Sequence, residues 1–233
     1  MPVPTLLRTA ALNETYSGVT YHIEGELVPV LQVELSSMPV YFEHHILLWK
    51  DPAVNIGLKS FKGTFKRMIS GLPLFITEAH GPGRIAFSRD GPGHVFAIHL
   101  QQGRGIDVRE HQFLAASSNV DYSFRRVQGV ASMLFSGTGF FIDTFSTQHQ
   151  EGVVWLQGYG NVFEIELGAG EQIDIEPGGW IYKDPGVTME TKVQKLSSGF
   201  FASAGQLVWN RFTGPGRIGL QSWYMSMMEE AGG

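Results

Sequence analysis

The chain has 233 residues, a formal net charge of −5 and no cysteine. Without cysteine, disulfide bonds and thiolate metal sites are excluded. The acidic chain has no run of lysine and arginine and so lacks the basic stripe that neutralises phosphates, and we expect no nucleic-acid partner. Hydrophobic residues make up 43% and charged residues 17%, which indicates a globular chain.

The first 13 residues contain one arginine and no sustained apolar run. They have the character of neither a secretory signal nor a mitochondrial presequence. No segment approaches the roughly 20 consecutive apolar residues that a membrane-spanning helix needs. By elimination, the sequence predicts a cytoplasmic protein without a transmembrane segment, for which peripheral membrane association stays open.

We expect residues 1–18 to be a lead-in with an edge strand after its two prolines. Apolar and polar residues then alternate from Leu27 to Leu35, which is the period of a half-buried strand. The same alternation recurs at Phe96–Leu100 and Phe163–Leu167. The opposite faces of these strands carry polar residues and are expected to meet solvent: Glu34, His99 and Glu166.

Further short strands are predicted along the rest of the chain. An apolar strand follows each alternating segment, at residues 46–50, 113–116 and 180–183. Longer strands come next, at residues 54–67, 120–130 and 187–195, and after them others at 74–77, 140–145 and 207–212. The last strands, at 84–88 and 217–222, follow glycine-rich turns. Only residues 222–231 suit a short helix, and they equally suit a frayed tail.

Two motifs recur in one register. Gly81-Pro82-Gly83-Arg84-Ile85 returns at residues 214–218, and Lys50-Asp51-Pro52-Ala53-Val54 returns, with one change, at residues 183–187. Proline stops a strand at the Lys-Asp-Pro turn, because it fixes φ and has no N–H. Glycine on both sides of a proline suits a tight turn that needs a positive φ at one position. Shared register indicates internal duplication.

A third copy lies in the middle of the chain. Val95–Leu100 aligns with Val162–Leu167 and with Val30–Leu35. A Ser/Gly-rich signature also occurs three times, at residues 70–75, 136–141 and 203–208. We therefore predict one compact domain, residues 1–233, made of three units at about 19–88, 89–158 and 159–223. In the middle unit, Gly152–Gln157 takes the place of the Gly-Pro-Gly turn and its strand.

One unit alone would expose a long sheet edge and bury too little core. Three units can pair their edges, so the sequence predicts an all-β sandwich or barrel with pseudo-threefold symmetry. Large aromatic residues are expected to fill its core rather than to stack on nucleic-acid bases. These residues are Phe75, Phe140, Phe141, Trp155, Trp180, Trp209 and Trp223.

Histidine and glutamate gather in one predicted turn. It holds Glu43-His44-His45 in the first unit and Glu110-His111 in the second, whereas the third has Glu176-Pro177-Gly178. If the pseudo-threefold axis brings these turns together, they could hold a divalent metal; otherwise they are polar turns pointing apart. His94 and His99 are five residues apart and so face opposite sides of a strand, which disfavours a metal site there.

Arg84 and Arg217 follow the glycine-rich turns, and arginine can hold a carboxylate or a phosphate with two parallel hydrogen bonds. No helix is predicted after either turn, so a phosphate-binding loop is not indicated. The alternative is that each arginine pairs with a neighbouring acid and braces its turn. Asp107 and Asp174 are equivalent in two units, which favours a structural role. With no Gly-x-Ser-x-Gly motif either, we assign no catalytic, cofactor-binding or metal-binding residue.

The order of these motifs resembles the altered inheritance of mitochondria (mitochondrial biogenesis) protein family. The resemblance is carried by Val162–Leu167 and its copies, by the Ser-Gly signature before Phe140, and by Gly81–Ile85 with its copy, and covers nearly the whole chain. It implies three tandem β-sandwich repeats of the kind seen in the trp RNA-binding attenuation protein, a TRAP-like fold of the double-stranded β-helix type. It carries over no tryptophan or RNA binding, because fold does not imply function. Eukaryotic members are linked to organisation of the mitochondrial inner membrane.

We therefore expect a non-enzymatic structural or interaction protein of uncharacterised role, and the resemblance implies a link to assembly or membrane organisation. Its expected partners are proteins, including further copies of itself as a homo-oligomer, and no cofactor is expected. The alternative is a β-barrel module that binds a small ligand or a metal. A metal-dependent enzyme is a further alternative.

Overall fold

The computed structural model describes residues 2–7, 12–59, 76–89, 91–127, 140–195 and 206–223. Its described part consists of antiparallel strands and one turn of 3-10 helix, η1 (His44–Ile46), which confirms the predicted all-β class. The Ser/Gly signatures at 70–75, 136–139 and 203–205 lie outside the described residues, as do Phe75 and nearly all of residues 222–231, for which a short helix and a frayed tail were both expected.

The first group of strands forms a sandwich of two sheets. One sheet has the order β2 (Leu12–Tyr16), β3 (Val19–Glu24), β4 (Val30–Leu35), β9 (Gly83–Phe87) and β6 (Leu47–Lys50). The other contains β5 (Val40–Glu43), β8 (Ile76–His80) and β7 (Asn55–Leu58). Buried side chains of both sheets, among them Val33 and Phe42, share one core cluster.

The second group repeats this pairing order. Its first sheet contains β10 (Gly93–Leu100), β15 (Gly152–Tyr159) and β12 (Phe113–Ser117). Its second contains β11 (Gly105–Arg109), β14 (Phe140–Ser146) and β13 (Asp121–Val127). Ile98 and Phe145 belong to the core between them. The strand that begins at Gly152 pairs with β10 and β12, as β9, which follows a Gly-Pro-Gly turn, pairs with β4 and β6.

The third group has the same order again. One sheet contains β1 (Thr5–Leu6), β16 (Val162–Leu167), β21 (Gly216–Gln221) and β18 (Trp180–Lys183). The other contains β17 (Gln172–Ile175), β20 (Gln206–Thr213) and β19 (Thr188–Lys195). Ile165 and Phe212 share its core. The first 18 residues thus contribute strands to two different groups, because β1 pairs with β16 of this group whereas β2 pairs with β3 of the first.

Neighbouring groups are joined by continuous sheets. Strand β12 of the second group pairs with β5 of the first, and β18 of the third pairs with β11 of the second. At the first joint, Ala115 lies opposite Phe42 and Ala116 opposite Tyr41. At the second, Tyr182 lies opposite Val108 and Lys183 opposite Asp107. These two joints produce the six-stranded and the seven-stranded sheet.

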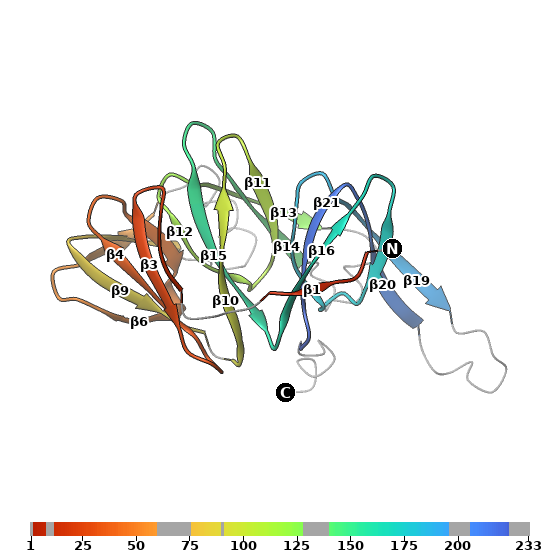
Figure 1. Ribbon diagram of the computed structural model, residues 1–233, viewed down its shortest axis with the longest axis horizontal. Helices are drawn as coiled ribbons and strands as arrows, with labels where there is room; N and C mark the ends of the chain where they lie inside the picture. Colours follow the sequence, from red (N-terminus) through yellow and green to blue (C-terminus); the bar gives the residue numbers. More distant parts are fainter. Residues whose placement is uncertain are drawn as a thin grey trace.

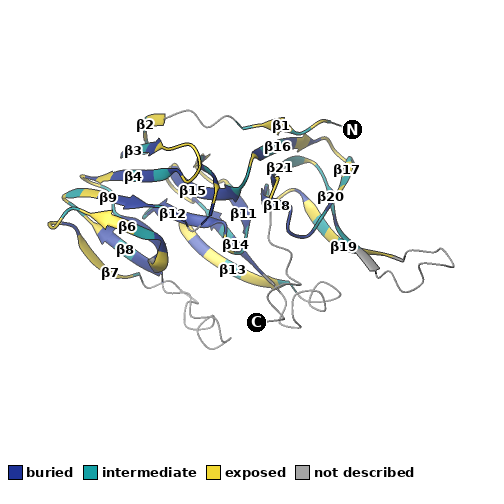
Figure 2. Ribbon diagram, turned by 90° about the horizontal axis from the view of Figure 1, so that it is seen from below, coloured by how far each residue is buried: buried dark blue, intermediate teal, exposed yellow. Residues whose placement is uncertain are grey.

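The groups follow one another along the long axis of the molecule (Figure 1). Strands β6 and β17 lie towards opposite ends, and buried residues dominate the strands between them (Figure 2). Among the described strands, β6 pairs only with β9 and β17 only with β20. A closed pseudo-threefold arrangement would need a contact between these two ends, so that symmetry stays a prediction without a strand pair to support it.

The alternating strand at residues 27–35 is shorter than predicted. Leu31, Val33 and Leu35 are buried as expected, but β4 begins at Val30 and Leu27 is 75% exposed. Gly25 has a φ of +120°, and the Cβ that another residue would add there would lie 3.0 Å from the Cα of Pro29. The chain therefore turns over residues 25–29, a tight reversal that the apolar alternation alone did not reveal.

Candidate functional site

The two repeated motifs meet in the folded chain. The turn glycines Gly83 and Gly216 have φ values of +134° and +137°, which confirms the predicted positive φ after each proline. Each turn brings the following arginine against the aspartate of a Lys-Asp-Pro turn. The backbone N–H of Arg84 donates to Oδ2 of Asp51 at 2.9 Å, with the arginine Nε 3.7 Å from the same atom.

The second copy of this contact is tighter. The backbone N–H of Arg217 donates to Oδ2 of Asp184 at 3.0 Å. Its guanidinium donates through Nε to Oδ2 at 3.2 Å and through Nη2 to Oδ1 at 3.1 Å. Both arginines therefore brace their turns against a neighbouring acid, one of the two roles expected from the sequence.

A second carboxylate adjoins Arg217. Nη1 of Arg217 lies 3.7 Å from Oε2 of Glu164, and that atom accepts a hydrogen bond from the hydroxyl of Tyr182. The hydrogen bonds to Asp184 raise the pKa of Arg217 above its ordinary value, and burial raises the pKa of Tyr182 well above its ordinary value. Tyr182 therefore stays protonated and acts as a donor, not as a base.

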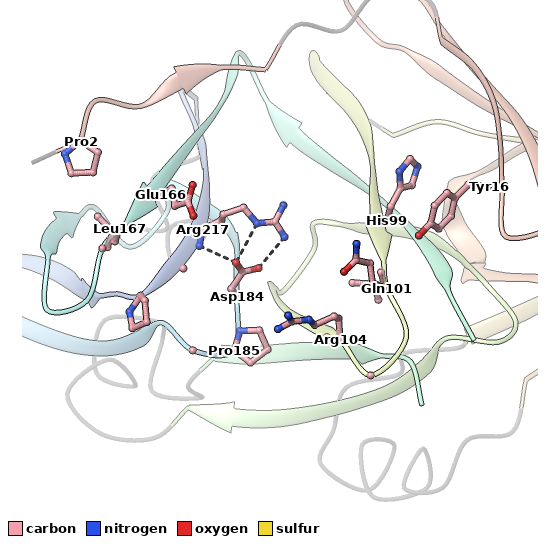
Figure 3. Close-up of a pocket in the computed structure, with 17 residues that line it drawn as sticks. Pro2, Tyr16, His99, Gln101, Arg104, Glu166, Leu167, Asp184, Pro185 and Arg217 are labelled. Atoms are coloured by element: carbon pink, nitrogen blue, oxygen red, sulfur yellow. Dashed lines mark hydrogen bonds and ion pairs between the residues drawn. The ribbon is translucent and has the colours of Figure 1, made fainter. Parts of the chain in front are cut away.

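Arg217 and Asp184 border a cleft of about 1350 Å³. In Figure 3 they lie near its centre, with His99 and Tyr16 to one side and Glu166 to the other. Arg104 also lines the cleft and is exposed. Within the described part of the chain its guanidinium takes part in no hydrogen bond or ion pair, so its charge is open to a ligand.

On the other side of the cleft, His99 belongs to a small polar cluster. Its ring stacks on Tyr16 with centroids 4.0 Å apart, and its Nε2 lies 3.0 Å from the hydroxyl of Tyr21 and 3.3 Å from Oε2 of Glu14. Tyr21 also donates to Glu14, and burial followed by this hydrogen bond raises the pKa of Tyr21. His99 lies on the solvent face of β10, as predicted.

A smaller cavity of about 440 Å³ reaches the same two side chains, His99 and Arg217, and is lined by Glu14 and Tyr182 as well. The two hollows therefore share His99 and Arg217, whose side chains are paired with Glu14 and with Asp184. Such a lining can bind a charged group. Nucleophilic catalysis needs a side chain activated by a neighbouring base, and the tyrosines here are held protonated.

The first Glu/His turn is braced by an arginine. Glu43 is buried, and its Oε2 lies 3.2 Å from Nη2 of Arg89 and 3.4 Å from Nε2 of His45. Arg89 also donates to the carbonyl oxygen of Phe113 at 2.8 Å and so ties the first group of strands to the second.

In the second Glu/His turn, the glutamate side chain binds the backbone of a neighbouring strand. Glu110 accepts a hydrogen bond from the N–H of Phe141 at 3.1 Å and lies 3.8 Å from His111. Over the described residues, no group of three histidine, aspartate or glutamate side chains could hold a metal ion. His94 is half-buried, which lowers its pKa, and Nδ1 has no hydrogen-bond partner among the described atoms.

The two equivalent aspartates form different contacts. Asp107 is buried and accepts hydrogen bonds from Arg125 and Thr144 at 2.7 and 2.8 Å, while Nζ of Lys183 lies 2.9 Å away across the joint. Asp174 holds Arg211 with two parallel hydrogen bonds of 2.7 Å. Both carboxylates thus form ion pairs with basic side chains of the fold.

Sequence reasoning missed two kinds of residue that tie segments of the fold together. Arg89 follows a strand without any motif around it. Gln157 and Gln221 each donate a side-chain hydrogen bond to the backbone, to the carbonyl oxygens of Gly91 and Gly178 at 3.1 and 2.7 Å. A signal for the glutamines existed, because each follows a leucine at the end of an equivalent strand.

Most of the predicted core aromatics that can be placed are buried. Phe141, Trp155 and Trp180 lie in the interior. Trp223 is 45% exposed and meets Tyr159 edge-on with ring centroids 5.5 Å apart, so its assignment to the core was wrong. Trp209 is only partly buried.

These features define an all-β protein of sandwiched antiparallel sheets joined end to end. The family described as mitochondrial biogenesis AIM24 matches residues 21–223, and the chain belongs to this family. An uncharacterised protein of Streptococcus pyogenes serotype M6 is 27% identical over 199 residues, which cover 82% of this chain and 75% of that protein.

A crystal structure of a Streptococcus pyogenes protein has the same fold. It superimposes with a TM-score of 0.69 at 19% identity, over 91% of this chain and 97% of the other. Its likeness supports the architecture alone. The described residues contain no helix with the length and apolarity to cross a membrane.

Proposed function

We propose that this protein is a non-enzymatic structural or interaction protein. The observation that supports this most directly is the repeated contact between a turn aspartate and a turn arginine, Asp51 with Arg84 and Asp184 with Arg217. A catalytic centre concentrates its reactive groups in one asymmetric place, whereas these groups brace the same turn twice.

The architecture supports the same proposal. The three groups of strands share one pairing order, as expected for three tandem TRAP-like sandwich repeats within a single domain. Chains built in this way present long surfaces to partners. The description of the family as mitochondrial biogenesis proteins suggests a role in assembly or membrane organisation, exercised through protein partners or self-association.

The test is affinity capture from the native organism with the tagged chain as bait. We expect a defined protein partner or further copies of the chain itself to be recovered in amounts comparable to the bait. A matched bait that carries Arg104→Ala, a change to an exposed side chain without hydrogen bonds or ion pairs among the described residues, should recover the same partner. Recovery of neither a partner nor copies by either bait contradicts the proposal.

The cleft supports a second candidate, a module that binds a small ligand. The cleft is larger than the roughly 300–1,000 Å³ of ordinary ligand pockets, so a small molecule can enter it, and the guanidinium of exposed Arg104 is available to an anionic group. A thermal-shift screen with small carboxylic acids, phosphate and divalent metals tests it. A large stabilisation that Arg104→Ala removes would favour the binding module, because a ligand of the native state raises its melting temperature. No shift with any of these probes excludes the candidate.

A further inference from the structure

The two joints within the chain have the same geometry. At one joint β12 of the second group pairs with β5 of the first, and at the other β18 of the third group pairs with β11 of the second. The residues that lie opposite one another occupy equivalent positions in the two joints. The strands β6, β12 and β18, one in each group, are also irregular in the same way. The pairing of each with a neighbouring strand skips one residue, namely Leu48 in β6, Leu114 in β12 and Ile181 in β18.

The skipped residue is the apolar centre of each joint. Leu114 is fully buried and belongs to the core of the first group, although its strand belongs to the second. Ile181 is fully buried in the same way in the core of the second group. The equivalent Leu48 is 55% exposed, because the described strands include none that pairs with the outer edge of β6.

An ion pair accompanies the apolar contact at one joint. Nζ of Lys183 lies 2.9 Å from Oδ2 of Asp107, and both side chains are buried. Lys50 occupies the position of Lys183 at the open edge of β6 and is exposed. Asp174 occupies the position of Asp107 in β17, and its side chain is 35% exposed. The two halves of a third joint are therefore present, one at each end of the molecule (Figure 2).

We infer that β6 of one molecule pairs with β17 of a second copy, in the register of the internal joints. This inference rests on the proposed interaction function and names its partner and surface. Lys50 then lies opposite the second copy's Asp174, and Trp49 opposite its Ile175, as Lys183 and Tyr182 lie opposite Asp107 and Val108. Leu48 enters the core of the last group of strands of that second copy.

The contact is heterologous, because it joins two different edges. Each molecule keeps one free edge of each kind, so association continues head to tail until a ring closes or a filament forms. Antiparallel pairing satisfies the backbone groups that an unpaired edge strand exposes. The opposite charges of Lys50 and Asp174 select this pairing over β6 with β6 or β17 with β17.

Engineered cysteines test the register directly, because the natural chain has none. The variant Lys50→Cys/Asp174→Cys is oxidised, or treated with a short bis-maleimide, and resolved on non-reducing gels. We expect a ladder of dimers and larger species. A mixture of the two single variants should give dimers only, and each single variant alone should give monomer.

The control for random collision is Lys50→Cys/Gln150→Cys, which places the second thiol on an exposed loop away from both edges. Cross-linking of Lys50→Cys alone would indicate pairing of two β6 strands and overturn the inference. Equal yields from the control and the double variant overturn it too, as does the absence of cross-links in the double variant. If affinity capture still recovers a different protein, the proposed function survives this failure.

A second measurement is the mass of the natural chain, without engineered cysteines, by light scattering over a range of concentrations. We expect association that Leu48→Glu weakens by at least about tenfold, in the manner of a central interface residue. Leu27→Glu changes a leucine that is more exposed than Leu48, 75% against 55%, and lies outside both edges, so association should stay unchanged. A chain that remains monomeric at every concentration contradicts head-to-tail pairing.

Discussion

Lys183 and Asp107 come from different groups of strands, and their side chains meet 2.9 Å apart across the pairing of β18 with β11. Burial alone would raise the pKa of Asp107, but the hydrogen bond and charge of Lys183, with help from Thr144 and Arg125, lower it. The pair therefore holds two groups of strands together and is stable only while the carboxylate is ionised.

Asp107→Asn should destabilise the protein strongly. The change leaves buried Lys183 without its counter-charge, and breaking a buried pair in this way typically costs about 3–5 kcal/mol. Urea unfolding of the variant measures the loss. The matched change Asp174→Asn breaks an exposed pair with Arg211 and should cost less than about 1 kcal/mol. Equal effects of the two changes would show that burial at the joint does not matter.

Stability should also depend on pH through Asp107. Its pKa is lower in the folded protein than the ordinary 3.8, so the unfolded chain takes up a proton first as the pH falls. The contribution is complete above pH 3.8 and disappears as the pH drops through the lower folded value. Unfolding curves between neutral and strongly acid pH should be less pH-dependent for Asp107→Asn than for the natural chain. An unchanged pH dependence would place the responsible carboxylates elsewhere.

Gly216→Ala should destabilise the Gly-Pro-Gly turn. At a φ of +137° the new Cβ would lie 2.9 Å from Cγ2 of Val187, and backbone strain of this kind costs about 1–3 kcal/mol. Thermal unfolding measures the effect. Gly57→Ala is the control, since that glycine has no heavy atom within 4 Å of the added Cβ and lies in exposed β7. Similar melting temperatures for both variants would contradict the strain argument.

Leu114→Ala and Leu48→Ala should differ sharply in the dilute monomer. Leu114 fills a closed joint, and truncation of a buried leucine leaves a cavity that costs about 2–5 kcal/mol. Leu48 occupies the equivalent place on an open edge, so its truncation should change the free energy of unfolding by less than about 0.5 kcal/mol. Chemical unfolding at low protein concentration checks both values. A large effect at Leu48 in the monomer would mean that its side chain is already covered.

Sequence periodicity identified most strands because local alternation reflects burial on one face. Leu31, Val33 and Leu35 illustrate this, and the repeated Asp-Pro and Gly-Pro-Gly motifs located the turns at which Asp184 meets Arg217. The same alternation failed at Leu27, where a tight reversal at Gly25 ends the strand early.

The candidate site depended more on contacts between distant segments. No local pattern specifies that Lys183 faces Asp107, or that Arg89 bridges Glu43 and the backbone of Phe113. The cleft arises for the same reason. His99 and Arg217 become neighbours only through the arrangement of separate strands, so sequence reasoning singled out each residue without placing them in one hollow.

The pairing of β1 with β16 has a consequence for synthesis on the ribosome. Residues 5–6 are translated before the other described strands, yet their partner strand, at residues 162–167, is translated only in the last third of these 233 residues. The N-terminal segment must therefore wait, unpaired with its native neighbour, while the first two sandwiches assemble behind it. Its docking marks a late step in the maturation of the nascent polypeptide, and a bulky fusion at that terminus would interfere with completion rather than with initiation.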